Sequence, residues 1–247
     1  MKIATLATTL LLSILACISW AEESEDVQPP VISGDLITNI PDDLKHLLME
    51  NPHVRFLLLI SENGELLYRL ATESNHYELI EPATRLIDQA TFTPAFQEGQ
   101  PVPSRFEVTI RFRDVDQERW KETGVIPMGN NTMKVAEKRM YDRDPSQYTY
   151  QRSEIKELDT PLQLISGSIV VLKDENGTPV TGDATVEYYI DHNGHALLPT
   201  IQKNSNNDPL LTMSVIKTLE KLLFEPPAHD GKPTYVIVKQ TFSFTGE

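Results

Sequence analysis

The fold is decided by residues 182–244, which open with the run GDATVEYYIDHNG and close with the run TYVIVKQTFSF. The first run leads into a turn at residues 191–194, where Asn-Gly supplies the positive φ angles that a tight hairpin needs. Residues 209–223 carry apolar side chains at helical spacing. The side chains that share one face of this helix are Leu211, Val215, Leu219 and Leu222 or Leu223. The stretch therefore predicts a β-hairpin, an amphipathic helix and a closing strand, with Asn207 as the helix cap and Pro209 in its first turn.

Residues 54–112 follow the same plan. An apolar run at residues 56–60 reaches a turn that contains Asn63-Gly64, and an alternating strand returns from it. The spacing then becomes helical, and because Pro82 is tolerated only in a first helical turn, we expect the helix to begin near Ile80. Alternating apolar residues up to Phe112 predict the last strand.

These two stretches align as an internal repeat. The aligned landmarks are Gly64 with Gly194, Phe92-Thr93-Pro94 with Phe224-Glu225-Pro226, and Gly99-Gln100-Pro101 with Gly231-Lys232-Pro233. The last two pairs are equally far apart along the chain and the first pair is slightly closer, so one small insertion separates hairpin from helix. Landmarks in the same order indicate a tandem duplication. We predict an α+β fold of two small β-β-α-β units, each a helix packed on an antiparallel sheet. Units of roughly 60 residues are marginal for an independent core, so we expect packing between them or against the linker.

The remaining residues divide the chain into segments. We predict a signal peptide at residues 1–21, a leader with a short capping helix at 22–52, the first unit at 53–113, a charged linker at 114–161, and the second unit with a lead-in hairpin at 162–247. The acidic leader is expected to be flexible up to Pro30, and the short helix is expected over residues 42–49. Trp120 is the candidate anchor of the linker.

The first residues form a targeting segment. Residues 3–16 are apolar apart from Thr and Ser, and Ser19-Trp20-Ala21 places small residues where a signal peptidase reads. Cys17, the only cysteine, leaves lipidation open, since the run ILAC resembles a lipobox. Retention of the segment as a membrane anchor is a third interpretation. After ordinary cleavage the mature chain has no cysteine, and its stability must come from packing.

Charge and motifs restrict the function. The formal net charge of −14 disfavours nucleic acid as a partner, and membrane contact is expected only through an anchor or lipid. His192 and His195 with Asp191 bracket a tight turn, and no further ligand lies at a metal-site spacing. There is no nucleophile elbow, phosphate-binding loop or dinucleotide fingerprint. We therefore predict no enzyme activity, no catalytic residue, no cofactor and no metal. A hydrolase with a dispersed site is an alternative that a pocket of clustered polar residues would support.

The second stretch resembles the C-terminal domain of the TonB energy-transducer family. The matching runs are residues 182–191, the turn ending at Gly194, LLFEPP at residues 222–227 and DGKP at residues 230–233. The resemblance implies a periplasmic domain that binds a short segment of an outer-membrane transporter, which adds as a strand to the sheet. An unpaired edge strand supplies the backbone donors and acceptors. Our candidate edge residues are Tyr235, Ile237, Val238, Gln240 and Phe242.

We therefore expect an exported, non-enzymatic protein-binding module of the bacterial envelope. Its expected partner is an envelope protein or a segment of an outer-membrane transporter. A working transducer needs a membrane anchor and a long proline-rich spacer, whereas the 17 prolines of this chain are scattered. A membrane-anchored energy transducer for outer-membrane uptake stays open as the alternative. The expected location is the periplasm, with tethering through Cys17 or an uncleaved N-terminus as the variant.

Overall fold

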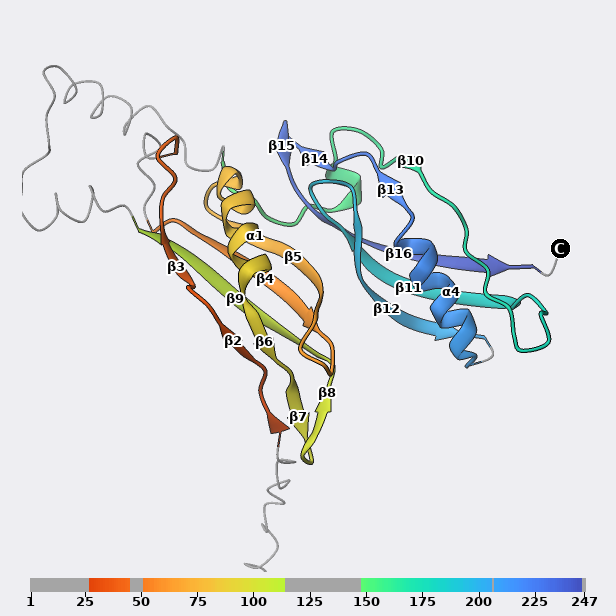
Figure 1. Cartoon of the computed structure of the whole chain (residues 1–247). Helices are drawn as coiled ribbons and strands as arrows, with labels where there is room; N and C mark the ends of the chain where they lie inside the picture. Colours follow the sequence, from red (N-terminus) through yellow and green to blue (C-terminus); the bar gives the residue numbers. More distant parts are fainter. Residues whose placement is uncertain (1–26, 45–50, 114–147, 206, 246–247) are drawn as a thin grey trace, which may run out of the picture.

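The computed structural model describes residues 27–44, 51–113, 148–205 and 207–245 (Figure 1). The predicted signal peptide with Cys17, most of the expected helix at residues 42–49, and most of the linker with Trp120 lie outside these ranges. Within them, no helix is both long enough and apolar enough to cross a membrane.

The first unit is a four-stranded sheet with one helix packed against it (Figure 1). Its elements are β3 (Ile37–Asn39), β4 (His53–Ile60), β5 (Leu66–Ser74), the 3-10 turn η2 (Tyr77–Leu79), α1 (Ile80–Gln89) and β9 (Ser104–Arg113). The strand order is β3-β9-β4-β5. Strands β5 and β9 flank β4 in antiparallel pairing, and β3 runs parallel to β9. The helix begins at Ile80, as the position of Pro82 predicts.

The second unit repeats this plan without an equivalent of β3. Its elements are β11 (Gly182–Ile190), β12 (Ala196–Asn204), α4 (Pro209–Leu219) and β16 (Val236–Phe244), with the strand order β12-β11-β16. Ile60 lies opposite Ser104 in the first sheet, and Ile190 lies opposite Val236 in the second. The alignment of the two stretches therefore holds in the strand register as well as in the sequence. The predicted α+β fold of two β-β-α-β units is confirmed.

Short strands add to this plan, two before the first predicted unit and the others within the two units. They are β1 (Val27–Gln28), β2 (Val31–Ser33), β6 (Thr91–Thr93), β7 (Ala95–Gln97) and β8 (Gln100–Val102), followed by β10 (Leu164–Ser166), β13 (Leu223–Phe224), β14 (Ala228–His229) and β15 (Lys232–Pro233). Ile32 of β2 pairs with Phe92, and Leu164 of β10 pairs with Phe224, at equivalent positions of the two repeats. A second 3-10 turn, η4 (Ile155–Glu157), precedes β10.

Three predictions were wrong, one about the leader and two about the ends of α4. The leader is not free up to Pro30, because Val27 and Gln28 pair with Gln97 and Phe96 of β7. Backbone partners in the first unit thus order the described end of the leader, residues 27–28. The cap of α4 is Asp208, whose carboxylate accepts from the Leu210 N–H at 2.8 Å, rather than Asn207. The helix also ends at Leu219 instead of continuing to residue 223, because the chain then turns into β13.

Each unit has a core between its helix and its sheet. Buried members in the first unit include Val54, Phe56, Leu58, Ile60, Leu79, Ala83 and Ile87. In the second unit they include Val186, Tyr188, Ile190, Leu211, Val215 and Leu219. Leu211, Val215 and Leu219 of the predicted stripe therefore face the sheet, whereas Leu222 and Leu223 lie beyond the end of α4.

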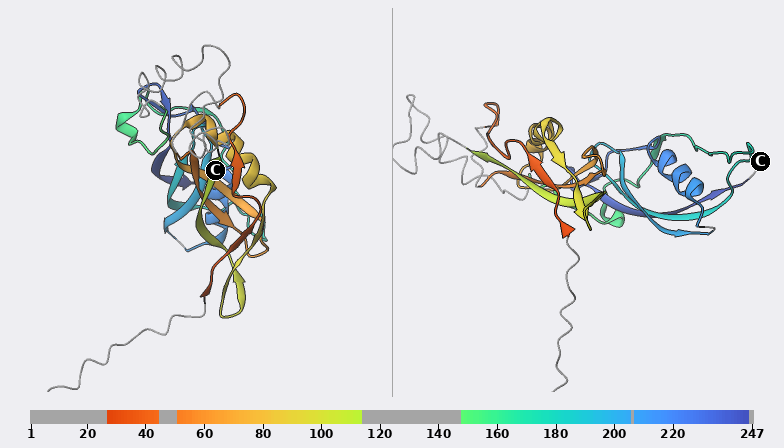
Figure 2. Two further views of the ribbon diagram at one scale, coloured as in Figure 1. Left: turned by 90° about the vertical axis from the view of Figure 1, so that its left-hand side faces the viewer. Right: turned by 60° about the horizontal axis from the view of Figure 1, so that its bottom comes forward.

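The two units pack against each other, with β12 beside β5 (Figures 1 and 2). Tyr150, Leu198 and Tyr235 are buried in the core of the first unit, although all three lie outside it in sequence. The Arg105 guanidinium of β9 donates to the Leu198 carbonyl at 3.3 Å and to the Thr200 hydroxyl at 2.9 Å. This junction enlarges two cores that are each small for an independent domain.

Candidate functional site

The outer edge of β16 is the surface that the resemblance singles out. Strand β16 pairs with β11 along its whole length. On the other side, the described part of the chain makes one bridge, between Arg152 and Tyr235, just before the strand begins. There the Ser153 N–H donates to the Tyr235 carbonyl at 3.0 Å. Beyond this point no described strand pairs with β16, so its edge is open from Ile237 onward.

The direction of the backbone groups decides which residues of β16 can receive a partner. N–H and C=O groups of successive strand residues point to opposite sides. Because the Tyr235 carbonyl points away from β11, the backbone groups of Ile237, Lys239, Thr241 and Ser243 do so too. The first unit supports this assignment, since Arg111 and Arg113 of β9 hydrogen bond outward and correspond to positions 243 and 245.

Side chains give the edge one apolar and one polar face. Val238 and Phe242 are partly buried and pack against the second core. The Tyr188 hydroxyl donates to the Gln240 side chain at 2.9 Å, and burial raises the pKa of Tyr188 to about 12, which keeps that proton in place. On the opposite face Lys239, Thr241 and Ser243 are exposed. An incoming strand with alternating apolar and polar side chains fits such an edge.

All of the predicted edge residues lie on or beside β16. Tyr235 precedes the strand and packs against Tyr150 and Tyr189, and its carbonyl is already bonded. The backbone groups of Val238, Gln240 and Phe242 point toward β11, so these residues contribute side chains rather than open donors. Sequence reasoning missed the outward donors of Lys239, Thr241 and Ser243. The alternation of the strand was visible in the sequence. Which alternate residues point their backbone groups outward depends on the pairing with β11 and on the bond to Ser153.

The corresponding edge of the first unit is paired at its end, residues 111–113. Strand β3 lies along β9, where the Arg111 N–H donates to the Leu36 carbonyl and the Ile40 N–H donates to the Arg113 carbonyl, both at 2.9 Å. In the second unit the chain after β10 takes another path. The N–H groups of Val170 and Leu172 donate to the hydroxyls of Thr218 (2.9 Å) and Ser214 (3.1 Å) on α4. The lead-in to the second unit therefore contributes only the short strand β10, and no described segment pairs with the outer edge of β16.

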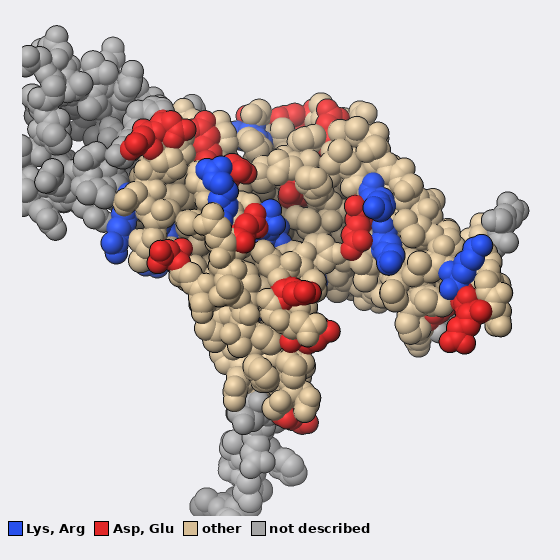
Figure 3. Space-filling model, in the orientation of Figure 1, with Lys and Arg blue, Asp and Glu red and all other residues tan. Residues whose placement is uncertain are grey.

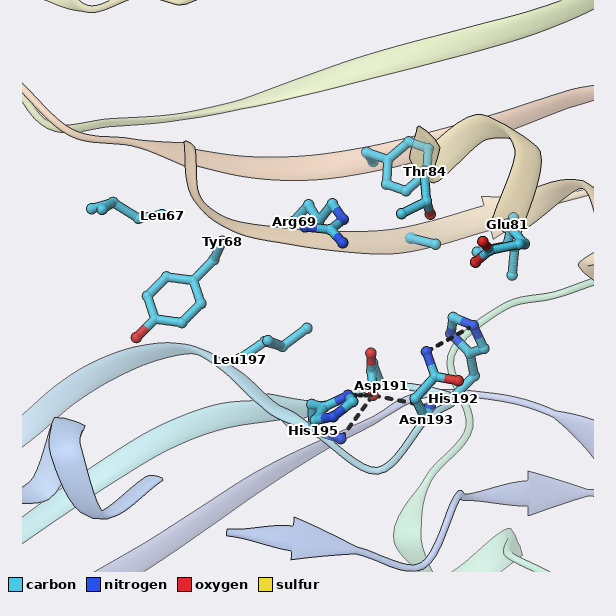
Figure 4. A pocket seen from close by; sticks show the side chains of 13 residues that line it. Leu67, Tyr68, Arg69, Glu81, Thr84, Asp191, His192, Asn193, His195 and Leu197 are labelled. Carbon is cyan, nitrogen blue, oxygen red and sulfur yellow. Dashed lines mark hydrogen bonds and ion pairs between the residues drawn. The ribbon is translucent and has the colours of Figure 1, made fainter. Parts of the chain in front are cut away.

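A cleft of about 240 Å³ lies between the units, where the turn after β11 faces β5 and α1 (Figure 4). Asp191 holds this turn, because its Oδ1 accepts from the N–H groups of Asn193 (3.0 Å) and His195 (2.8 Å). Ser61 holds the matching turn of the first unit through Asn63 and Glu65. Arg69 in the cleft is paired with Asp88 at 3.0 Å. Asp191 and Arg69 thus have structural roles.

His192 in this cleft predicts a pH dependence of stability. Burial lowers the pKa of His192, and the Asp191 and Glu81 carboxylates oppose this shift only in part, while His195 adds to it. The unfolded chain then binds a proton below about pH 6.5 that the folded chain binds less readily, so stability is complete above that pH and falls below it. We expect the free energy of unfolding to decrease from pH 7.5 to 5.5, and to decrease less in His192→Gln. Urea unfolding at both pH values measures this, with His195→Gln, an exposed position, as the control. Equal slopes in all three proteins would contradict the assignment.

One further cluster of potential metal ligands has a structural role. Asp159, His229 and Asp230 have ligand atoms within 4.8 Å of one another, and the two aspartates are exposed. The Asp159 carboxylate accepts from the N–H groups of Asp230 and Gly231, both at 2.8 Å. This carboxylate clamps the loop between β14 and β15.

On the face shown in Figure 3, acidic and basic side chains are interspersed among neutral residues. No strongly basic area gathers on the described part of this face. A surface that binds nucleic acid would need a cluster of basic side chains.

Comparison with known proteins agrees with the geometry. The family described as Gram-negative bacterial TonB protein C-terminal matches residues 49–113 and again residues 178–245, together more than half of the chain. No curated protein and no solved structure matches the chain. The matched segments contain both β-β-α-β units, including β9 and β16. The chain therefore belongs to the family of Gram-negative bacterial TonB protein C-terminal domains, of which it carries two tandem copies.

Proposed function

We propose that this protein is an exported, non-enzymatic binding module that captures an extended segment of another envelope protein by strand addition at β16. Its family consists of TonB-like modules for protein interaction or energy transduction in the envelope. The observation that carries the proposal is the difference between the two units. In the first unit β3 pairs with residues 111–113 at the end of β9, and in the second no described strand pairs with the outer edge of β16.

Strand addition suits this edge for two reasons. The outward backbone groups of Ile237, Lys239, Thr241 and Ser243 have no strand partner among the described residues, and an added strand would satisfy them. The side chains of Val238 and Phe242 lie only partly buried beside that edge. They offer apolar contact to alternate side chains of the incoming segment, and such contacts give selectivity.

Replacing Lys239 with proline tests this edge directly. Proline removes an outward N–H and leaves the ladder between β16 and β11 intact, and edge strands tolerate it for that reason. We expect Lys239→Pro to lose partner capture while unfolding within a few degrees of the wild type. Lys239→Ala, which removes the same charge and keeps the donor, should retain capture.

Capture can be measured in the native envelope with a photo-crosslinking amino acid at Ser243, an exposed position at the end of the edge. Mass spectrometry of the adduct then identifies the partner segment. A crosslinker at Lys203, an exposed residue of β12, serves as the positional control. Strand addition at β16 is wrong if the Ser243 adduct is unchanged by Lys239→Pro or equals that at Lys203.

The state of the N-terminus separates the binding module from a membrane-anchored transducer. The apolar run at residues 3–16 supports export, and its retention would support an anchor for energy transduction. N-terminal sequencing of the protein from envelope fractions distinguishes these outcomes. A start at Glu22 supports the exported module, an acylated Cys17 indicates a lipid tether, and an intact Met1 favours the transducer.

A further inference from the structure

We propose that the outer edge of β9 is a second strand-acceptor site and that the chain's own residues 36–40 occupy it as an internal ligand. This inference rests on the proposed function, because it takes strand addition to be a property of both units. It goes further by assigning a site in the first unit, the kind of peptide that fits it, and the segment of the chain that occupies it.

The backbone contacts of residues 36–40 are those of an added strand. Ile37, Thr38 and Asn39 lie opposite Arg111, Phe112 and Arg113 in parallel register. The Leu36 carbonyl accepts from Arg111, and the Ile40 N–H donates to Arg113. The segment comes from outside the β-β-α-β unit and follows β2, which pairs elsewhere with β6. It covers only the end of β9, whereas β4 pairs with β9 from Ser104 to Arg111.

The side chains of the segment define the ligand class. Leu36, Thr38 and Ile40 alternate with Ile37 and Asn39, as in any strand. Ile40 is 3% exposed and Leu36 packs against the first core, whereas Ile37 on the other face is 46% exposed. The β9 edge therefore fits an extended peptide that carries apolar side chains at alternate positions and runs parallel to β9.

The second unit shows that this occupation is specific to the first. Since Ile32 of β2 corresponds to Leu164 of β10, residues 36–40 correspond to residues 168–172. In the second unit that segment is bonded through Val170 and Leu172 to hydroxyls of α4 instead of to β16. The two edges are equivalent in the repeat, and the path of the preceding segment decides whether the end of the edge is paired. While residues 36–40 are in place, no partner strand can pair with residues 111–113 of β9.

Releasing residues 36–40 should create a second acceptor. By alternation, the Thr38 N–H points toward β9 and the Ile37 N–H points away, so Thr38→Pro disrupts the pairing and Ile37→Pro is its matched control. Both changes are made in full-length chain that carries Lys239→Pro, which closes β16. The probe is a fluorescein-labelled peptide with the sequence GDLITNIP of residues 34–41.

We expect the peptide to bind the Thr38→Pro chain one to one and at least tenfold more tightly than the Ile37→Pro chain. Absence of binding to a folded Thr38→Pro chain overturns the internal-ligand assignment, and so does equal binding by the two variants. Either result leaves the proposal for β16 untouched, because β16 is closed in both. Loss of capture by Lys239→Pro alone, in turn, tests β16 without involving residues 36–40.

Native-state hydrogen exchange keeps the inference testable if Thr38→Pro does not fold. In the chain with Lys239→Pro alone, release of residues 36–40 exposes the Arg111 and Ile40 amides, while the Phe112 amide stays bonded to the Pro52 carbonyl at 2.9 Å. We expect the Arg111 and Ile40 amides to exchange at least tenfold faster than that of Phe112. Equal protection of all three means that residues 36–40 open only with the whole sheet, and it overturns the proposal.

Discussion

Replacing Gly194 with alanine should unfold the second unit under conditions in which the wild type is folded. Gly194 has a φ angle of 85°, where an L side chain is strained, and an added Cβ would lie 2.0 Å from the Phe224 carbonyl oxygen. That oxygen belongs to the backbone of β13, which is fixed by the bond from the Phe224 N–H to the Gly194 carbonyl at 2.9 Å. Left-handed strain and overpacking together should cost roughly 3 kcal/mol or more. Urea denaturation followed by circular dichroism measures the loss.

Gly231 provides the matched control for this prediction. Its φ angle is 70°, but an added Cβ would meet nothing within 4 Å. Gly231→Ala should therefore show the conformational cost alone, about 1 kcal/mol. Gly64, which corresponds to Gly194, would place a Cβ 2.5 Å from the Phe92 carbonyl oxygen and should behave like Gly194 in the first unit. Equal losses for Gly194→Ala and Gly231→Ala would contradict the steric argument.

The close approach at Gly194 explains why the repeat was visible in the sequence. The turn glycine and the Phe-x-Pro run are distant along the chain, yet they touch in both units. The turn glycine and the Phe-x-Pro run restrict each other's positions, so their order and spacing are characteristic of the fold. The hairpins, the helices and the closing strands were predictable because they rest on local spacing and on turn residues. The repeat could therefore be found without any knowledge of which side chains touch.

Features that depend on distant backbone partners were not predictable in the same way. Residues 27–40 are interrupted by two prolines and a glycine, and their pairing with β6, β7 and β9 depends on backbone partners that lie far away along the chain. Which residues of β16 point their backbone groups outward likewise depends on the register with β11. The Tyr150 contribution to the first core could not be read from residues 114–161, whose composition indicates a linker.

Tyr150 should be the most sensitive residue of the junction between the units. Its side chain is fully buried, and its ring centroid lies 5.6 Å from that of His192 and 5.9 Å from that of Tyr235. Its backbone pairs with Ser74 at the end of β5, through bonds of 2.8 and 3.0 Å. One residue thus joins the edge of the first sheet to two segments of the second unit. Removing its ring leaves a cavity in the first core, beside His192 and Tyr235.

We expect Tyr150→Ala to lose about 3–5 kcal/mol of stability, the usual cost of truncating a large buried aromatic side chain. Because Tyr150 also couples the units, a single cooperative urea transition should split into two. Tyr150→Phe keeps the ring and should lose no more than about 1 kcal/mol. Intrinsic tyrosine fluorescence near the junction, compared with far-ultraviolet circular dichroism, separates the transitions. Coincident transitions with a small loss in Tyr150→Ala would mean that the two units are held together by β5, β12 and Arg105 without Tyr150.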